Sequence, residues 1–157
     1  PFLIKPLKSK YFTNKIKGLQ FLPNFNLSFS SYREKDNYKI IENNSFPEEV
    51  NFIWKQFSKN IEVAIERDKK YLDWRYIQKP NENYKIAHCY SKDNKLLGFV
   101  VYTIKEKHNG RIAYIMELLY DLKEAKAGAL LLNYATSMIK KENADSILSW
   151  CLEHSPN

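Results

Sequence analysis

The stretch from Arg111 to Trp150 constrains the fold of this chain most strongly. It reads RIAYIMELLYD, then LKEAKAGALLLNYATSMIKK, then ADSILSW, a pattern that predicts a strand, a tight loop, a helix and a second strand. Two strands joined by a helix form a parallel crossover unit, and ligands of open α/β sheets bind where such a strand leads into its helix. We therefore expect a binding or catalytic site at the turn between the first strand and the helix.

Three further strands are predicted ahead of this unit, at Tyr38–Glu42, Tyr84–Tyr90 and Leu96–Lys105. The run LLGFVV in the third of them is typical of a strand buried on both faces. Polar turns of hairpin length separate the last two strands from each other and from Arg111, so three consecutive antiparallel strands lead into the crossover unit. The order of elements predicts a mixed α/β (α+β) fold, with a mostly antiparallel sheet flanked by helices and a parallel unit on its C-terminal side.

Two helices are predicted between the first and second of these strands. One begins with a capping box made by Ser45 and Glu48 and ends near Ser58. The next is capped by Asp68 and ends before Pro80. The first helix should pack on the core through one apolar stripe, formed by Val50, Ile53, Trp54 and Phe57.

The length and the apolar content of the chain indicate a globular protein with one core. A length of 157 residues with 44% hydrophobic content suffices for one core. No apolar run approaches the roughly 20 residues that cross a bilayer, and no signal-peptide pattern is present, which predicts a soluble, cytoplasmic protein.

The net charge of +7 fits an anionic partner such as a phosphate-rich cofactor, nucleic acid or a membrane surface. A lysine-rich composition alone explains it equally well, and specific nucleic-acid binding is the less favoured alternative.

The cysteines and histidines do not suggest a metal site. Cys89 and Cys151 each lie in an apolar stretch that predicts a strand, where a free thiol behaves as a small buried hydrophobe. The three histidines, His88, His108 and His154, are not at metal-ligand spacing with one another or with the cysteines. The sequence therefore predicts neither a disulfide nor a bound metal.

The N-terminal residues, 1–37, carry mixed aromatic and basic side chains. Pro6 and Pro23 interrupt any long periodic element, which is typical of a linker or an extended arm. Lysines interleaved with Phe21 and Phe25 could form a nucleic-acid surface of cations and stacking rings. The favoured alternative is a strap whose aromatic side chains anchor it to the domain or to a neighbour.

Glu117 is the candidate catalytic residue. Strict alternation along the strand places it on one face with Ala113, Ile115 and Leu119. A carboxylate among apolar neighbours loses hydration, which raises its pKa and suits it to accept a proton from an amine, directly or through a water. The alternative is a structural glutamate at the end of the sheet, hydrogen-bonded to a neighbouring segment of the chain.

Two further groups could bind ligands. The helix after Asp121 begins with small residues, and its free backbone amides would suit an anion such as a pyrophosphate near Lys126, Ala127 and Gly128. Small residues at a helix start also allow close helix–sheet packing. Trp74 and Arg75 could shape a substrate site, since a guanidinium offers a planar fork to a carboxylate or phosphate, or they could be a packing anchor beside a solvated arginine.

The order of these elements over about 38–152 resembles the GNAT superfamily of acetyl-CoA-dependent N-acyltransferases. The segments RDKKYLDWRYIQKP, LLGFVVYTI, MELLYD and LKEAKAGALLLNYA are similar to a bacterial and archaeal branch in which two such domains can occur in tandem. The resemblance implies that 1–37 is a linker or the tail of a preceding domain. It also implies that 38–157 is an acyltransferase domain that stops after its fifth strand.

The resemblance also implies site residues. The family's pyrophosphate loop falls on Leu122, Lys123, Glu124, Ala125, Lys126 and Ala127, where Leu122 replaces the usual Gln or Arg and Ala125 replaces the first Gly. Acetyl-CoA would be the co-substrate, with no metal, and would lie between the two strands of the crossover unit. The amide near Leu118 would polarise the thioester carbonyl, and Glu117 matches a strand on which related enzymes place a glutamate base.

Three functions follow from the resemblance. The leading one is an N-acyltransferase that moves an acetyl group from acetyl-CoA to a primary amine. The second is a non-catalytic module of the same fold that packs on a sister domain or a partner protein, which the departures at Leu122 and Ala125 favour. The third is a tRNA-dependent aminoacyl transferase, which would explain the net positive charge of the chain.

Overall fold

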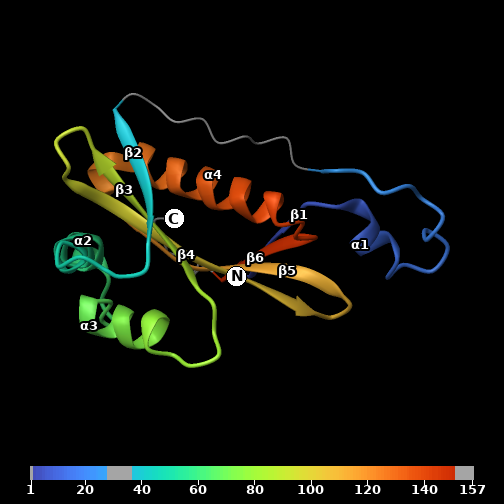
Figure 1. Ribbon diagram of the computed structural model, residues 1–157, viewed down its shortest axis with the longest axis horizontal. Helices are drawn as coiled ribbons and strands as arrows, with labels where there is room; N and C mark the ends of the chain where they lie inside the picture. The colour runs from blue at the N-terminus through green and yellow to red at the C-terminus, as the bar shows by residue number, and fades with distance from the viewer. Residues whose placement is uncertain (1, 28–36, 151–157) are drawn as a thin grey trace.

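A six-stranded sheet forms the centre of the protein (Figure 1). The computed structural model describes residues 2–27 and 37–150. The sheet has the order β1-β6-β5-β4-β3-β2, and all neighbouring strands are antiparallel except the β5–β6 pair. Its strands are β1 (Phe2–Pro6), β2 (Tyr38–Asn43), β3 (Lys85–Ser91), β4 (Leu96–Lys107), β5 (Gly110–Tyr120) and β6 (Ser146–Trp150). The predicted mixed fold and its parallel C-terminal unit are confirmed.

Helices cover both faces of this sheet (Figure 1). The long helix α4 (Ala125–Lys141) packs on one face, where Leu131 and Ile139 are fully buried against Val100 and Tyr102. The other face is covered by α2 (Val50–Phe57), α3 (Lys69–Leu72) and the π-helical turn Asp73–Ile77 that continues α3. Because β4 lies between these two layers, its residues 96–103 are all buried, as the apolar run predicts. Short elements complete the chain: α1 (Ser9–Thr13) and the 3-10 turns Ser58–Asn60 and Leu122–Glu124.

The start of α2 differs from the predicted capping box. The helix begins at Val50 after the N-cap residue Glu49, and no side-chain hydrogen bond caps it within the described residues. Phe46 is buried against Phe99 and takes part in the core, so the residues before Val50 form a turn and tertiary packing overrides the local capping signal. The predicted apolar stripe is confirmed, since Val50, Ile53, Trp54 and Phe57 are all buried.

The cap of α3 is confirmed. Asp68 accepts a hydrogen bond from the backbone amide of Tyr71 at 2.8 Å through Oδ1. An aspartate in this position satisfies one of the amides that a helix start leaves without an internal partner. It therefore fixes where the segment that carries Trp74, Arg75 and Tyr76 begins.

The strand β1 takes the edge position beside β6. Phe2–Pro6 pairs antiparallel with Ser146–Trp150, and the amides of Leu7 and Lys8 both donate to the carbonyl of Asp145. Leu7 is buried in the core below α4. These residues of the N-terminal segment are thus part of the sheet, while the assignment of 1–37 to a preceding domain stays a prediction.

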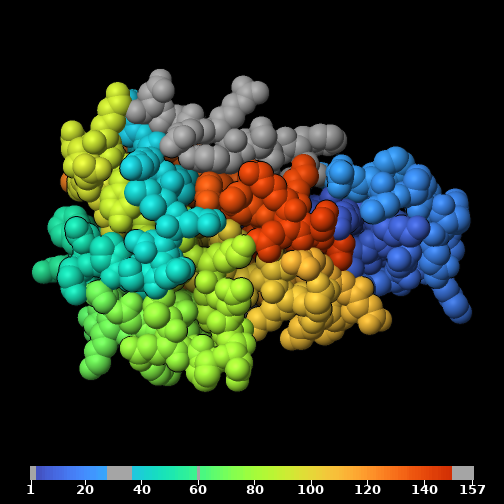
Figure 2. All heavy atoms as spheres, in the orientation of Figure 1, coloured from blue at the N-terminus to red at the C-terminus, as the bar shows by residue number. Residues whose placement is uncertain are grey.

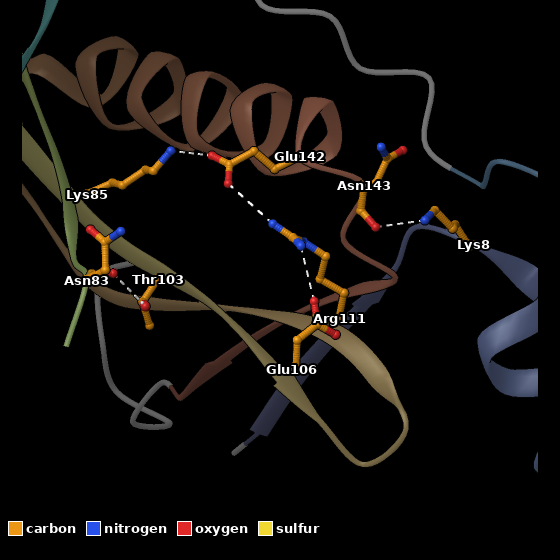
Figure 3. A network of polar contacts seen from close by, with 8 residues as sticks. All are labelled: Lys8, Asn83, Lys85, Thr103, Glu106, Arg111, Glu142 and Asn143. Carbon is orange, nitrogen blue, oxygen red and sulfur yellow. Dashed lines mark hydrogen bonds and ion pairs between the residues drawn. The ribbon is translucent and has the colours of Figure 1, made fainter. Parts of the chain in front are cut away.

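A polar network ties the far end of α4 to the sheet (Figure 3). The Arg111 guanidinium lies 3.1 Å from Glu106 and 3.7 Å from Glu142, and Lys85 also pairs with Glu142. Lys8 donates to the Asn143 carbonyl at 2.7 Å from the N-terminal side. These groups are partly exposed, so their role is to set the position of the chain between α4 and β6 more than to stabilise the fold.

Cys89 is a free, fully buried thiol in β3, and burial raises its pKa to about 11. This confirms the expected behaviour as a small hydrophobe. Cys151 and His154 lie outside the described residues. Across 2–27 and 37–150, none of the helices combines the length and the apolar character needed to cross a bilayer.

Candidate active site

A β-bulge interrupts β5 next to Glu117. Val101 of β4 is paired with Glu117, but the following residue, Tyr102, is paired with Ile115. Met116 is therefore one extra residue on β5 opposite this step. Such an insertion bends a strand and re-aims the side chains beside it.

The bulge corrects the predicted face of Glu117. Ala113 and Ile115 pack with α4, whereas Leu119 packs on the opposite face, with α2 and α3. Glu117 is on the α2–α3 side, where Tyr76 and Arg67 contact it. Strict alternation is wrong here because the extra residue shifts the side-chain register by one, which moves every later side chain to the other face.

Both carboxylate oxygens of Glu117 have partners. The Tyr76 hydroxyl donates to Oε1 at 2.8 Å, and Nε of Arg67 donates to Oε2 at 3.0 Å. The Glu117 side chain is only 9% exposed. Arg67 is itself positioned, because its guanidinium lies 5.4 Å from the Trp54 ring centroid and donates to the Ile65 carbonyl.

Burial controls the pKa values of this cluster. It raises the pKa of Glu117 above the ordinary value, and the Arg67 guanidinium, the Tyr76 hydroxyl and the Arg75 charge offset this only in part. Burial and the neighbouring carboxylate also raise the pKa of Tyr76, so its hydroxyl stays protonated as a donor. Glu117 therefore takes up a proton at higher pH than an exposed glutamate does.

The last parallel pair of β5 and β6 among the described residues lies next to this bulge. The described pairs run from Ile112–Ser146 to Ile115–Ser149, and β5 continues to Tyr120 in register with β4. The bulge, the last described parallel pair and the buried carboxylate therefore lie within three residues of β5. Leu118, next to Glu117, is half-buried and opposite Val100, on the α4 side.

The turn from β5 to α4 is held by Asp121. Its side chain accepts from the Lys123 amide at 3.1 Å, its carbonyl accepts from the Glu124 amide at 2.7 Å, and Lys95 lies 3.7 Å from its carboxylate. At the start of α4 the residues predicted to hold a pyrophosphate divide into two groups. Exposed are Leu122, Lys123, Ala125 and Lys126, whereas Ala127 and Gly128 are buried.

Packing explains the glycine in this turn. A Cβ on Gly128 would lie 2.6 Å from the Tyr120 ring, closer than real side chains approach. Gly128 thus lets the Tyr120 ring at the end of β5 contact the first turn of α4. Of the two interpretations of the small residues, close helix–sheet packing holds for Gly128, while anion binding by the first turn stays a prediction.

The predicted substrate residues occupy different environments. Arg75 is half-buried beside Tyr76 and close enough to Glu117 to lower its pKa, and its Nε has no hydrogen-bond partner in the described part of the chain. Trp74 is 60% exposed and lies against Tyr71 at the surface. The structure therefore brings Arg75 to Glu117 and leaves Trp74 outside this cluster.

Two residues of the cluster were not predicted from the sequence. Arg67 follows a stretch without periodicity, and only its place just before the Asp68 cap could have drawn attention to it. Tyr76 stands four residues after Leu72, and both are buried on one helical face, but nothing local indicates that its hydroxyl reaches a strand 41 positions later. Among residues 2–27 and 37–150, no group of three or more His, Cys, Asp or Glu side chains is placed to hold a metal ion.

The sequence matches no protein-family model and no curated protein. Solved structures with similar folds do exist. One is a Pyrococcus furiosus protein provisionally described as an acetyl transferase, 20% identical, with a TM-score of 0.57 over 76% of this chain and 85% of that one. Another is a GNAT-family acetyltransferase from Staphylococcus aureus, 19% identical, with a TM-score of 0.56 over 74% and 75%.

A third similar structure is Saccharomyces cerevisiae N-myristoyltransferase with bound myristoyl-CoA. It is 14% identical, with a TM-score of 0.62 over 94% of this chain, which spans 41% of that protein. Identities this low establish the fold and not the activity. This chain therefore has the fold of the GNAT acyltransferases, as the resemblance in its sequence implies.

Proposed function

We propose that this chain is an N-acyltransferase that moves an acyl group from a coenzyme A thioester to a primary amine. One observation carries the proposal: a buried carboxylate, Glu117, stands at a bulge in β5, next to the last parallel pair with β6 that the described residues form. The GNAT fold supports it, since N-acetyl- and N-acyltransferases are found among the proteins that share this fold. Acetyl-CoA is the donor that the sequence predicts.

Glu117 is proposed as the general base. The amine nitrogen attacks the thioester carbonyl, the C–S bond breaks, the coenzyme A thiolate leaves, and the proton lost by the amine passes to Glu117 directly or through a water. The raised pKa favours this transfer because it brings the carboxylate closer to the working pH. Tyr76 and Arg67 would hold the carboxylate in one orientation throughout.

The pyrophosphate of the donor is proposed to bind at the start of α4. Within the described residues no side chain caps this helix, and Lys123 and Lys126 are exposed beside its first turn. Two nearby acids already have partners: Asp121 bonds to the Lys123 amide, and Glu124 accepts from the Tyr38 hydroxyl at 3.3 Å. The turn thus presents amides and ammonium groups more than free carboxylates.

Arg75 is proposed to face the acceptor. Its positive charge acts on Glu117 and no carboxylate pairs with it among the described residues, whereas Arg67 is paired with Glu117. A guanidinium in this position suits an acceptor that carries an anionic group near its amine. Trp74 would contribute only at the outer surface of such a site.

A non-catalytic module is the second candidate. Both oxygens of Glu117 are already bonded within the chain, which is also how a purely structural buried carboxylate is satisfied. In that case Glu117 would join the residues on either side of α3 to β5, and this fold would serve to pack on another domain or protein. Binding of the donor separates the two candidates.

Calorimetric titration of acetyl-CoA into the full chain tests the proposal. We expect saturable binding that weakens about tenfold when Lys123→Glu and Lys126→Glu are combined, because two charges beside the pyrophosphate are reversed. The matched control combines Lys55→Glu with Lys59→Glu, two exposed lysines in the last turn of α2 and in the 3-10 turn that follows it, and should leave the affinity unchanged. Absence of heat at millimolar acetyl-CoA would favour the non-catalytic module.

A further inference from the structure

The N-terminal arm, residues 7–27, is a folded projection with a closed base. The Ser9 amide donates to the Phe25 carbonyl at 3.0 Å, the Phe25 amide donates to the Ser9 hydroxyl at 2.7 Å, and the Leu27 amide donates to the Leu7 carbonyl at 2.8 Å. The chain thus leaves the sheet at Leu7, passes through α1 and several turns, and returns beside its starting point. Its surface is set by structure and not by an unfolded tail.

Contacts at the base hold the arm to the body of the protein. The Tyr11 ring packs on Gly110, where a Cβ would lie 2.2 Å from it, and Lys15 reaches the His108 carbonyl at 3.4 Å. Lys8 pairs with Asp145 at 3.2 Å. In Figures 1 and 2 the arm forms a blue lobe at one end of the molecule, beyond the hairpin of β4 and β5.

The arm exposes large apolar side chains between Ile16 and Leu27. Phe21 is 80% exposed, Phe25 57% and Ile16 52%. Leu19 and Leu27 are also exposed, so apolar groups recur along the whole return path. So many exposed large apolar side chains within one short segment indicate a surface that contacts a partner.

The charge of the same segment has one sign. Residues 7–27 contain four lysines and no aspartate or glutamate, against a net charge of +7 for the whole chain. Only Lys8 has a carboxylate partner among the described residues, and Lys10, Lys15 and Lys17 are exposed. The complementary partner is therefore both anionic and able to take up apolar side chains.

We propose that the N-terminal arm attaches the chain to the surface of an anionic lipid bilayer. Phe21, Phe25 and Ile16 enter the interface, and the lysines bind lipid phosphates and carboxylates around them. Nucleic acid fits less well, because stacking uses the phenylalanine rings but leaves the exposed aliphatic side chains without a role. The proposal does not depend on acyl transfer.

Co-sedimentation of the full chain with lipid vesicles tests the proposal. Vesicles of phosphatidylcholine with about 30% phosphatidylserine should bind the protein, pure phosphatidylcholine should bind it at least tenfold less, and binding should fall as salt rises. Combining Phe21→Ser with Phe25→Ser should reduce binding about tenfold or more. Phe52→Ser is the matched control, since Phe52 is 51% exposed on α2 outside the arm, and it should bind as the unmodified chain does.

Three results would overturn membrane attachment. One is no binding to either vesicle, the second is equal binding by the double variant and the unmodified chain, and the third is equal binding to the two kinds of vesicle. If neither vesicle binds, salt-sensitive binding of tRNA that the double variant loses would assign the arm to nucleic acid. Because Phe21 and Phe25 are exposed, the double variant should keep the thermal unfolding midpoint of the unmodified chain, which verifies that it is folded.

Discussion

The Glu117→Gln variant is expected to lose acyl-transfer turnover by about 10²-fold or more while acetyl-CoA binding stays unchanged. Glutamine has nearly the same shape: its carbonyl oxygen can accept from Nε of Arg67, and its amide group can donate to the Tyr76 hydroxyl, which then acts as the acceptor, so the cluster keeps its geometry. What it cannot do is take the proton that the amine must lose. The measurement is kcat with acetyl-CoA and an amine acceptor, beside a calorimetric affinity for acetyl-CoA.

Glu106→Gln is the matched control for this variant. Glu106 lies on β4 with its side chain 72% exposed and is bonded to Arg111, outside the Glu117 cluster. Its replacement should change turnover less than twofold. A loss of less than tenfold in Glu117→Gln would remove Glu117 as the base and leave it as a structural link that joins Arg67 and Tyr76 to β5.

The pH dependence of kcat/KM is a second test of Glu117 as the base. A base must be ionised to act, so kcat/KM should fall as pH drops through the raised pKa of Glu117. Arg67 is the strongest influence holding that pKa down, so Arg67→Gln should move the fall to higher pH. A profile that does not move in Arg67→Gln would mean that another group controls the rate.

Much of the sheet could be predicted from periodicity alone. The strands β2 to β6 lie within one or two residues of the predicted ranges, because apolar alternation and polar turns are local signals. The edge position of β1 could not be predicted in this way. Its partner β6 lies about 140 residues later, and no local pattern states which strand an isolated extended segment joins.

The candidate site shows the same division between local and distant information. Glu117 stands out in the sequence because a lone acid in an apolar strand is unusual. The sheet face predicted for Glu117 was wrong because of the bulge at Met116. This bulge arises from pairing with β4, which the sequence of β5 does not encode by itself. Arg67 reaches Glu117 across 50 positions from a segment without regular structure, so only the folded chain reveals the pair.

His88 carries the second large prediction: the free energy of unfolding should fall by about 2.5 kcal/mol between pH 7.5 and pH 4.5 because of this residue. It is completely buried in β3, beside the rings of Phe46, Tyr90 and Phe99. Within the described residues neither ring nitrogen has a hydrogen-bond partner. Burial without a partner for the charge lowers the pKa of His88 to about 4.

The direction of this change in stability follows from the pKa of His88 in the unfolded and in the folded chain. The unfolded chain takes up the proton near the ordinary histidine pKa of about 6.5, whereas the folded chain resists protonation until about pH 4. Stability is therefore fully present above about pH 6.5 and is lost progressively as pH falls from there toward 4. Below both values the loss levels off at about 3 kcal/mol.

Denaturant unfolding of His88→Leu and of the unmodified chain at both pH values isolates this effect. Carboxyl groups such as Glu82, whose pKa is lowered by Lys105, also destabilise the fold in acid, but they are common to both proteins and cancel in the comparison. The leucine variant should lose about 2.5 kcal/mol less than the unmodified chain on going to pH 4.5. His108→Asn, in the exposed turn between β4 and β5, should behave like the unmodified chain, since asparagine tolerates the positive φ of 55° at that position. His88→Leu and the unmodified chain could instead lose the same free energy of unfolding between the two pH values. That result would mean that His88 is already charged in the folded protein at pH 7.5, or that its protonation does not destabilise the folded protein.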